Sequence, residues 1–204
     1  MLEFFRSGGP FMWLLLLTSI VGLTFIVERG LALRWSRVVP VSVEKALEDF
    51  QAGQDASMLK QVCLLKPSPI GRLLLVAIDH FDWPRAENEN ALQTRARHEV
   101  VQLERGLVVL EIVVGIAPLL GLVGTIHGLT TLFGDLAHVG AGDNAALAKG
   151  IAIALNTTLS GLLIAIPSLI AWSYYNKKVE MLAVEMETMC DDLLRRFYRG
   201  KLAV

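Results

Sequence analysis

Three long stretches of this 204-residue sequence contain no aspartate, glutamate, lysine or arginine. They cover residues 7–27, 112–134 and 150–176. Each stretch reaches the length of about 20 mostly apolar residues that an α-helix needs to cross the hydrocarbon core of a bilayer. Charged residues are strongly disfavoured at the centre of such a helix. Their absence therefore predicts an all-α integral membrane protein with three transmembrane helices in the lipid bilayer.

Other absences exclude whole classes of function. The net charge is −1, so no basic surplus indicates binding to nucleic acid. The sequence contains no nucleotide-binding loop, no nucleophile paired with a base, and no cluster with metal-ligand spacing, so we expect neither an enzyme nor a bound cofactor or metal. Cys63 and Cys190 are the two cysteines. They lie far apart in the charged segments, which predicts reduced thiols and no disulfide.

The distribution of lysine and arginine predicts the orientation, because basic residues favour the cytoplasmic side. Arg6 alone precedes the first span, whereas Arg29, Arg34 and Arg37 follow it. The first stretch has no small-residue cleavage site, so we expect it to stay as a membrane helix. The predicted order is an outer N-terminus at 1–9, a transmembrane helix at 10–28, a cytoplasmic helical segment at 29–105, a second transmembrane helix at 106–134, an outer loop at 135–149, a third transmembrane helix at 150–175 and a cytoplasmic C-terminal helix at 176–204.

The cytoplasmic segments have helical patterns of their own. A helix is expected over 70–81, between Pro67-Ser68-Pro69 and Trp83-Pro84. Residues 87–105 contain strong helix formers and enter the second span without a breaker, which predicts one continuous helix. The tail carries an apolar stripe with steps of three or four residues, which predicts packing in a cytoplasmic helical bundle: Val179, Leu182, Met186, Met189, Leu193 and Phe197.

Small residues and hydroxyls share helix faces in the second and third spans. Successive residues turn by about 100° around a helix, which sets two faces with small side chains: Pro118, Gly121, Thr125 and Gly128 in one span, and Ala154, Thr158, Gly161 and Ala165 in the other. Small residues in membrane helices typically allow close contact between helices. A polar pore is the alternative that the threonines favour, and spacing alone leaves both interpretations open.

Two motifs resemble the signatures of the MotA/TolQ/ExbB proton channel family. The first is A-P-L-L-G-L-V-G-T-I-H-G at 117–128, and the second is G-I-A-I-A-L-N-T-T-L-S-G-L at 150–162, followed by Ala165-Ile166-Pro167. The first span is also similar to that of ExbB-like members. With three spans and a modest inner segment, the chain resembles the ExbB/TolQ branch.

The resemblance implies a homopentameric ring in the bacterial inner membrane, with the N-terminus in the periplasm and the C-terminus in the cytoplasm. It implies a pore formed by the second and third helices, which extend into the cytoplasmic bundle. A single-span partner of the ExbD/TolR type, with an intramembrane aspartate, threads this pore. A TonB- or TolA-like protein is a further implied partner.

The resemblance assigns Thr125 and Thr158 to the pore. It also implies a second set of residues that pack at the pore: Pro118, Gly121, Gly124, Gly128, Ala154, Gly161 and Pro167. Threonine hydroxyls donate and accept hydrogen bonds but do not titrate near neutral pH. Because the three uncharged stretches contain no carboxylate, we expect the titrating acid to come from the partner.

Several polar residues of the spans have more than one interpretation. Asn156, Thr157 and Ser160 line the pore, bind Na⁺, or bond to neighbouring helices. His127 stands where the family often has an aromatic residue; helix packing and a role as a proton relay are both considered. Many ExbB and TolQ sequences have glutamate where this chain has Ile153, which removes one proposed protonatable site.

The function predicted from these features is a proton-channel subunit of an inner-membrane motor that drives TonB-dependent transport. A TolQ-like subunit of a cell-envelope or motility motor is the alternative within the same class. A non-conducting membrane scaffold is the alternative from another class, supported by Ile153 and opposed by the two pore threonines.

Overall fold

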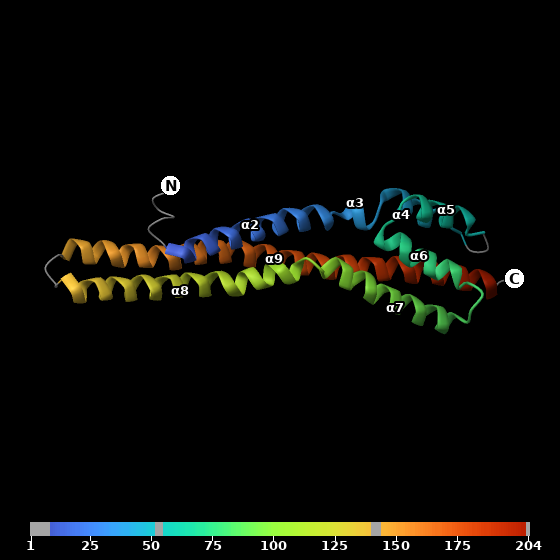
Figure 1. The fold of residues 1–204 in the computed structure, drawn as a ribbon. Helices are drawn as coiled ribbons and strands as arrows, with labels where there is room; N and C mark the ends of the chain where they lie inside the picture. The colour runs from blue at the N-terminus through green and yellow to red at the C-terminus, as the bar shows by residue number, and fades with distance from the viewer. Residues whose placement is uncertain (1–8, 52–54, 140–143, 203–204) are drawn as a thin grey trace. The chain divides into compact units, whose positions relative to one another are not determined.

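The computed structural model describes residues 9–51, 55–139 and 144–202, and its ordered elements in these ranges are all helices (Figure 1). The all-α prediction is confirmed. The helices are α2 (Gly9–Ala32), α3 (Trp35–Val38), α4 (Val41–Glu48), α5 (Ser57–Leu65), α6 (Pro69–Asp79), α7 (Arg85–Glu104), α8 (Leu107–Val139) and α9 (Asn144–Leu202).

Three segments are long and apolar enough to cross a membrane. They are Gly9–Ala32 in α2, Leu107–Gly134 in α8 and Leu147–Gly200 in α9. Each contains one of the three uncharged stretches of the sequence, or most of it. The prediction of three membrane-spanning helices is therefore confirmed by helix length and composition.

The chain divides into two compact units. The apolar unit combines residues 1–29 with 106–174, and the charged unit combines residues 30–105 with 175–204. The apolar unit contains α2, α8 and the first part of α9. The charged unit contains α3 to α7 and the last part of α9.

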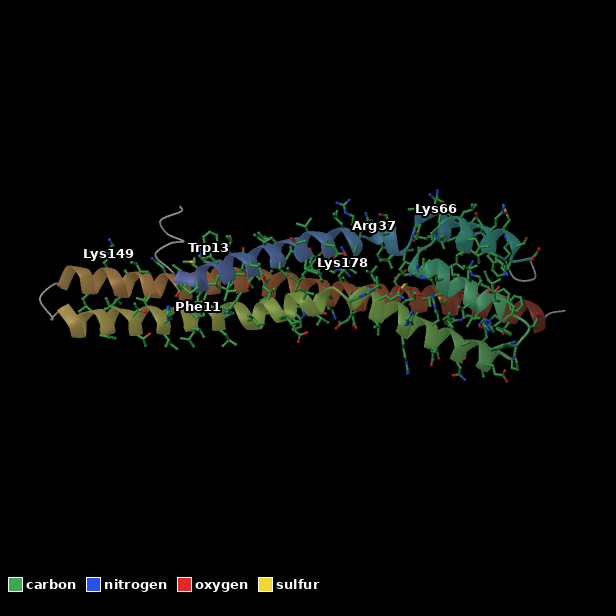
Figure 2. All side chains as sticks on the ribbon, viewed as in Figure 1. Phe11, Trp13, Arg37, Lys66, Lys149 and Lys178 are labelled. Carbon is green, nitrogen blue, oxygen red and sulfur yellow. The ribbon has the colours of Figure 1, made fainter. Side chains whose placement is uncertain are left out.

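Within the apolar unit, α2 packs against both other helices through a glycine. A Cβ atom at Gly22 would lie 3.3 Å from Ser168 Oγ and 3.3 Å from Val113 Cγ1. Met12 and Leu15 are buried on the same helix. Phe11 contacts α8, whereas Trp13 is 54% exposed (Figure 2). One face of α2 thus packs on the unit, and the other presents large apolar side chains to the surroundings.

Within the charged unit, α6 begins where its sequence predicts. The Ser68 hydroxyl accepts a hydrogen bond from the Gly71 amide at 3.1 Å, and Pro69 occupies the first turn, so the helix has an N-cap and a proline at a favourable position. Ile70, Leu73 and Leu74 are buried. The observed end at Asp79 lies two residues before the predicted end at Phe81.

The apolar stripe of the tail packs as predicted. Five of its six members are buried in the charged unit, and the sixth, Phe197, stacks on Phe81 with ring centroids 3.6 Å apart and planes within 7°. The stripe therefore contributes to the hydrophobic core of this unit.

The prediction of one continuous helix from 87 through the second span is wrong. Residues 105 and 106 form a turn between α7 and α8. A Cβ atom at Gly106 would collide with the Arg29 side chain. Glycine at this position leaves room for that arginine, and glycine also weakens a helix interior relative to alanine. A contact with a residue far away in sequence thus accompanies the break.

Helix also extends into the predicted outer loop at 135–149. The last residue of α8 is Val139 and the first of α9 is Asn144, and residues 140–143 lie outside the described part of the chain. Since α9 continues to Leu202, the third span and the C-terminal helix are one element. The positions of the membrane boundaries on these helices stay predictions.

Candidate functional site

Three threonine hydroxyls meet where α8 and α9 cross in the apolar unit. Thr125 comes from α8, and Thr157 and Thr158 are consecutive residues of α9. Thr125 Oγ1 lies 3.2 Å from Thr157 Oγ1 and forms a short hydrogen bond with Thr158 Oγ1. We call these three side chains the hydroxyl cluster.

Two main-chain carbonyls complete the cluster. The Ala154 oxygen accepts hydrogen bonds from Thr157 Oγ1 at 2.7 Å and from Thr125 Oγ1 at 2.9 Å. The Gly121 oxygen lies 3.2 Å from each of the three hydroxyl oxygens. Five oxygen atoms from two helices thus form one connected hydrogen-bond network.

Glycines allow the close approach that this network requires. A Cβ atom at Gly121 would lie 2.9 Å from the Thr157 carbonyl oxygen, and one at Gly161 would lie 2.5 Å from the Ala117 oxygen. At Gly124 the added atom would lie 3.0 Å from Thr157 Oγ1. At these positions, a side chain on one helix would overlap the backbone or side chains of the other, so the missing Cβ atoms set the helix separation.

The other residues predicted to pack at the pore differ in burial. Ala154 and Gly161 are buried, whereas Gly128 is half-buried, and a Cβ atom added to it would lie 3.1 Å from Ala154 Cβ. Pro118 is half-buried in α8, whereas Pro167 is exposed in α9. Gly128, Ala154 and Gly161 thus lie at the contact between the two helices.

Burial differs among the predicted pore residues. Thr125 and Thr157 are 9% and 1% exposed, while Thr158 and Asn156 are half-buried. The Ser160 hydroxyl donates to the Asn156 carbonyl of its own helix at 2.8 Å. Of the hydroxyl cluster, Thr158 is thus the member with the most open surface.

His127 lies on a different face of α8 from Thr125, as its position in the helix predicts. Its side chain is exposed in the chain, and its ring packs edge-on against Phe11 with centroids 5.5 Å apart. It borders a groove of about 350 Å³ that Ile153 and Thr157 also line. Packing and a relay role therefore both stay as interpretations of His127.

The chemistry available in the cluster is hydrogen bonding. Hydroxyl and carbonyl oxygens stabilise a charged or protonated group by donating or accepting hydrogen bonds, but they hold no proton that titrates near neutral pH. Among the described residues, no group of three or more histidine, cysteine or acidic side chains is placed to hold a metal ion.

The charged unit contains a buried ion-pair cluster that the sequence did not reveal. Glu99 is fully buried and pairs with Arg72 and, at 2.8 Å, with Arg95. The hydrogen bond to Glu99 is the main cause that raises the pKa of Arg72. Arg95 and Glu99 have the i,i+4 spacing of a helical ion pair, but no sequence signal identifies Arg72 as the third member.

The buried side-chain amide of Asn88 is a second feature that the sequence patterns do not predict. Asn88 is fully buried, and its Nδ2 donates to the carbonyls of Ala77 at 3.0 Å and His80 at 3.1 Å. These carbonyls lie at the end of α6, so the side chain satisfies acceptors that the helix end leaves open.

Comparison with known proteins agrees with the two motifs. The profile of the MotA/TolQ/ExbB proton channel family matches residues 66–188. A Synechocystis sp. protein named as ExbB-like 1 is 35% identical over 183 residues, which cover 84% of this chain and 69% of the relative.

Two further relatives match over most of their length. The biopolymer transport protein ExbB of Neisseria meningitidis is 27% identical over 97% of this chain and 96% of its own. The Tol-Pal system protein TolQ of Pseudomonas aeruginosa is 28% identical over 91% of this chain and 85% of its own. With three apolar helices and a family match over more than half of its length, this chain is a membrane protein that belongs to the MotA/TolQ/ExbB proton channel family.

Proposed function

We propose that this chain is the channel-forming subunit of an ion-driven energy-transducing complex in the bacterial inner membrane. Several copies, five by the family resemblance, surround a single-span partner of the ExbD/TolR type that carries an intramembrane aspartate. The observation that carries the proposal is the hydroxyl cluster at the crossing of two apolar helices whose uncharged stretches contain no acid.

The proposal divides the transport chemistry between two polypeptides. A proton must bind to a group that titrates, and a buried carboxylate fits that role. The threonine hydroxyls of this chain would hydrogen-bond to that carboxylate and keep it in place. Thr158 is the half-buried member of the cluster, whereas the other two threonines are buried, so it is the residue proposed to contact the partner.

Exposed apolar side chains of α8 and α9 fit an assembly of several copies in lipid. Large side chains such as Leu119, Ile126, Leu155 and Leu163 are 54–62% exposed on the chain. Lipid and neighbouring copies are the surroundings that such surfaces require. The same proposal places the N-terminus in the periplasm and the C-terminus in the cytoplasm, from the distribution of lysine and arginine.

TonB-dependent transport is the driven process that we propose, because relatives named ExbB match this chain over nearly its whole length. A TolQ-like role in the cell envelope is the second candidate, favoured by the match to a Tol-Pal system protein. Deletion of the gene separates the two processes: loss of TonB-dependent uptake supports the first, and a defect in envelope constriction with normal uptake supports the second.

The proposal is tested with the complex purified from native membranes through a tag on this chain. We expect a single-span protein with an intramembrane aspartate to co-purify, and the complex to take up protons when reconstituted in vesicles. Thr158→Val keeps the side-chain volume and removes the hydroxyl, so uptake should fall while assembly persists. Undiminished uptake by this variant, or by a complex whose partner aspartate is changed to asparagine, would contradict the proposed division of roles. An intact complex without any ion uptake would support a scaffold.

A further inference from the structure

The hydroxyl cluster contains one donor more than its carbonyl acceptors accommodate. Each threonine hydroxyl donates one proton, and each carbonyl oxygen has two lone pairs. Within a helix, one lone pair of each carbonyl accepts the amide four residues ahead. The oxygens of Gly121 and Ala154 therefore keep one position each, and the three hydroxyl protons compete for these two positions.

The distances indicate how this competition is resolved. Thr157 Oγ1 makes the shortest contact with the Ala154 oxygen, at 2.7 Å, compared with 2.9 Å for Thr125 Oγ1. When Thr157 fills this position, Thr125 donates its proton to the Gly121 oxygen, 3.2 Å away. Both carbonyl positions are then filled, so the proton of Thr158 points to the Thr125 oxygen, with which it is in close contact, or away from the cluster.

Burial selects Thr158 as the hydroxyl that can turn away. Thr125 and Thr157 are at most 9% exposed, and their hydroxyl oxygens are surrounded by the two helices. Thr158 is half-buried. Its proton is therefore the one that can bond to a group outside the cluster.

We propose that Thr157 is a positioning residue, which occupies the Ala154 carbonyl and thereby directs the Thr158 hydroxyl proton toward the carboxylate of the partner. This inference rests on the proposed function. When the partner acid is protonated, the pattern reverses: Thr157 donates to Gly121, Thr125 donates to Ala154, and Thr158 donates to Thr125. The free lone pair of Thr158 then accepts the acid proton. No hydroxyl gives up its own proton in either pattern.

Few titratable groups near Thr157 could also change the pH dependence of transport. The uncharged stretches of α2, α8 and α9 leave His127 as the histidine of the spans; its ring packs on Phe11, and it borders the groove that Thr157 also lines. Tyr174 and Tyr175 lie more than four helical turns along α9 from Thr158. Exchange of serine for alanine at position 157 leaves the space beside His127 nearly unchanged, so a difference between the pH dependences of these two variants reflects the hydroxyl.

Without the Thr157 hydroxyl, two protons remain for two carbonyl positions. The Thr158 hydroxyl can then donate to the Gly121 oxygen, so its hydrogen bond to the partner carboxylate is weakened. Because hydrogen bonds to a charged acceptor are stronger than those to a neutral one, the ionised carboxylate loses more than the protonated acid. The carboxylate should then take up its proton at a pH about one unit higher.

The test compares Thr157→Ala with Thr157→Ser in the purified complex. Both remove the methyl group, and serine alone keeps the hydroxyl. A potassium diffusion potential drives proton uptake into vesicles that have the same pH inside and outside. Uptake is measured from pH 5 to pH 9, which covers about two units above and below neutrality. We expect the pH of half-maximal uptake to be about one unit higher for alanine than for serine, with serine near the unmodified protein.

Thr157→Val is a second hydroxyl-free variant, which keeps the volume and should show the same shift as alanine. Equal pH midpoints for the alanine and serine variants would overturn the inference, even if both transport more slowly. Thr158→Ala separates this outcome from failure of the proposed function. If the Thr158 variant transports normally, the proposed site is wrong; if it fails while the Thr157 variants share one midpoint, the positioning role alone is wrong.

Discussion

Replacement of Gly161 by alanine should force α8 and α9 apart at the hydroxyl cluster. The added Cβ would lie 2.5 Å from the Ala117 oxygen and 3.2 Å from Gly121 Cα. A carbon atom normally stays about 3.3 Å or more from a carbonyl oxygen. Both close neighbours are backbone atoms, which a rotamer change cannot move. The helices must therefore separate locally by about 0.8 Å, which is the difference between the normal carbon–oxygen distance and the distance from the added Cβ to the Ala117 oxygen.

This separation should affect both stability and transport. Overpacking of a tight contact typically costs about 1–3 kcal/mol. The bond from Thr125 Oγ1 to the Ala154 oxygen is 2.9 Å long, and the same displacement would stretch it past the hydrogen-bonding limit of about 3.2 Å. We expect the midpoint of thermal unfolding to fall by about 2–10 °C and ion uptake to fall with it.

Gly115→Ala is the matched control, because nothing lies within 4 Å of a Cβ atom at Gly115. It adds the same methyl group to the neighbouring apolar helix, where alanine is the better helix former. Thermal unfolding in detergent, followed by circular dichroism, compares the two variants directly. The reasoning is refuted if Gly161→Ala unfolds at the same temperature as Gly115→Ala and conducts ions at the unmodified rate.

Three further predictions concern single side chains. Glu99→Gln should lower the free energy of unfolding by about 1–3 kcal/mol, because it leaves two half-buried arginines without their buried carboxylate. Glu89→Gln, in an exposed pair, should cost less in the same denaturation assay. Burial raises the pKa of the Cys63 thiol to about 11, so at pH 8 nearly all of this side chain is in the unreactive thiol form. Cys63 and the buried Cys190 should therefore react with maleimide only after the protein unfolds. Rapid labelling of the folded protein would contradict this prediction. His127→Trp should keep ion uptake if His127 only packs, whereas loss of uptake in an assembled complex would identify it as a relay.

The sequence predicts the helices well where a local pattern determines them. The uncharged stretches identify the three spans, and Ser68-Pro69 marks the start of α6. The turn at Arg105–Gly106 was not predicted. A single glycine between helix formers is a weak signal, and the arginine that needs the space at Gly106 is remote in sequence.

Part of the candidate site could also be predicted. Helical periodicity places Thr125 and Thr158 on the small-residue faces, and the helices do meet there. Thr157 is not on this face, because it lies about 100° around α9 from Thr158. Its place in the cluster depends on how the two helices cross, which a pattern along one helix does not contain. The ion pair of Arg72 with Glu99 was missed for the same reason.

The motif G-L-V-G-T at 121–125 is best understood as one structural device. Gly121 contributes twice: its missing Cβ leaves room for the Thr157 carbonyl, and its own carbonyl lies 3.2 Å from all three hydroxyls. Gly124 leaves room for the Thr157 side chain, and Thr125 then reaches the Ala154 carbonyl of α9. The hydrogen bond of 2.9 Å from Thr125 Oγ1 to the Ala154 oxygen requires the two backbones to approach closely. Its formation therefore depends on both glycines. The motif therefore encodes a distance between helices as well as a polar side chain, and a substitution at any of its three key residues should disturb the same network.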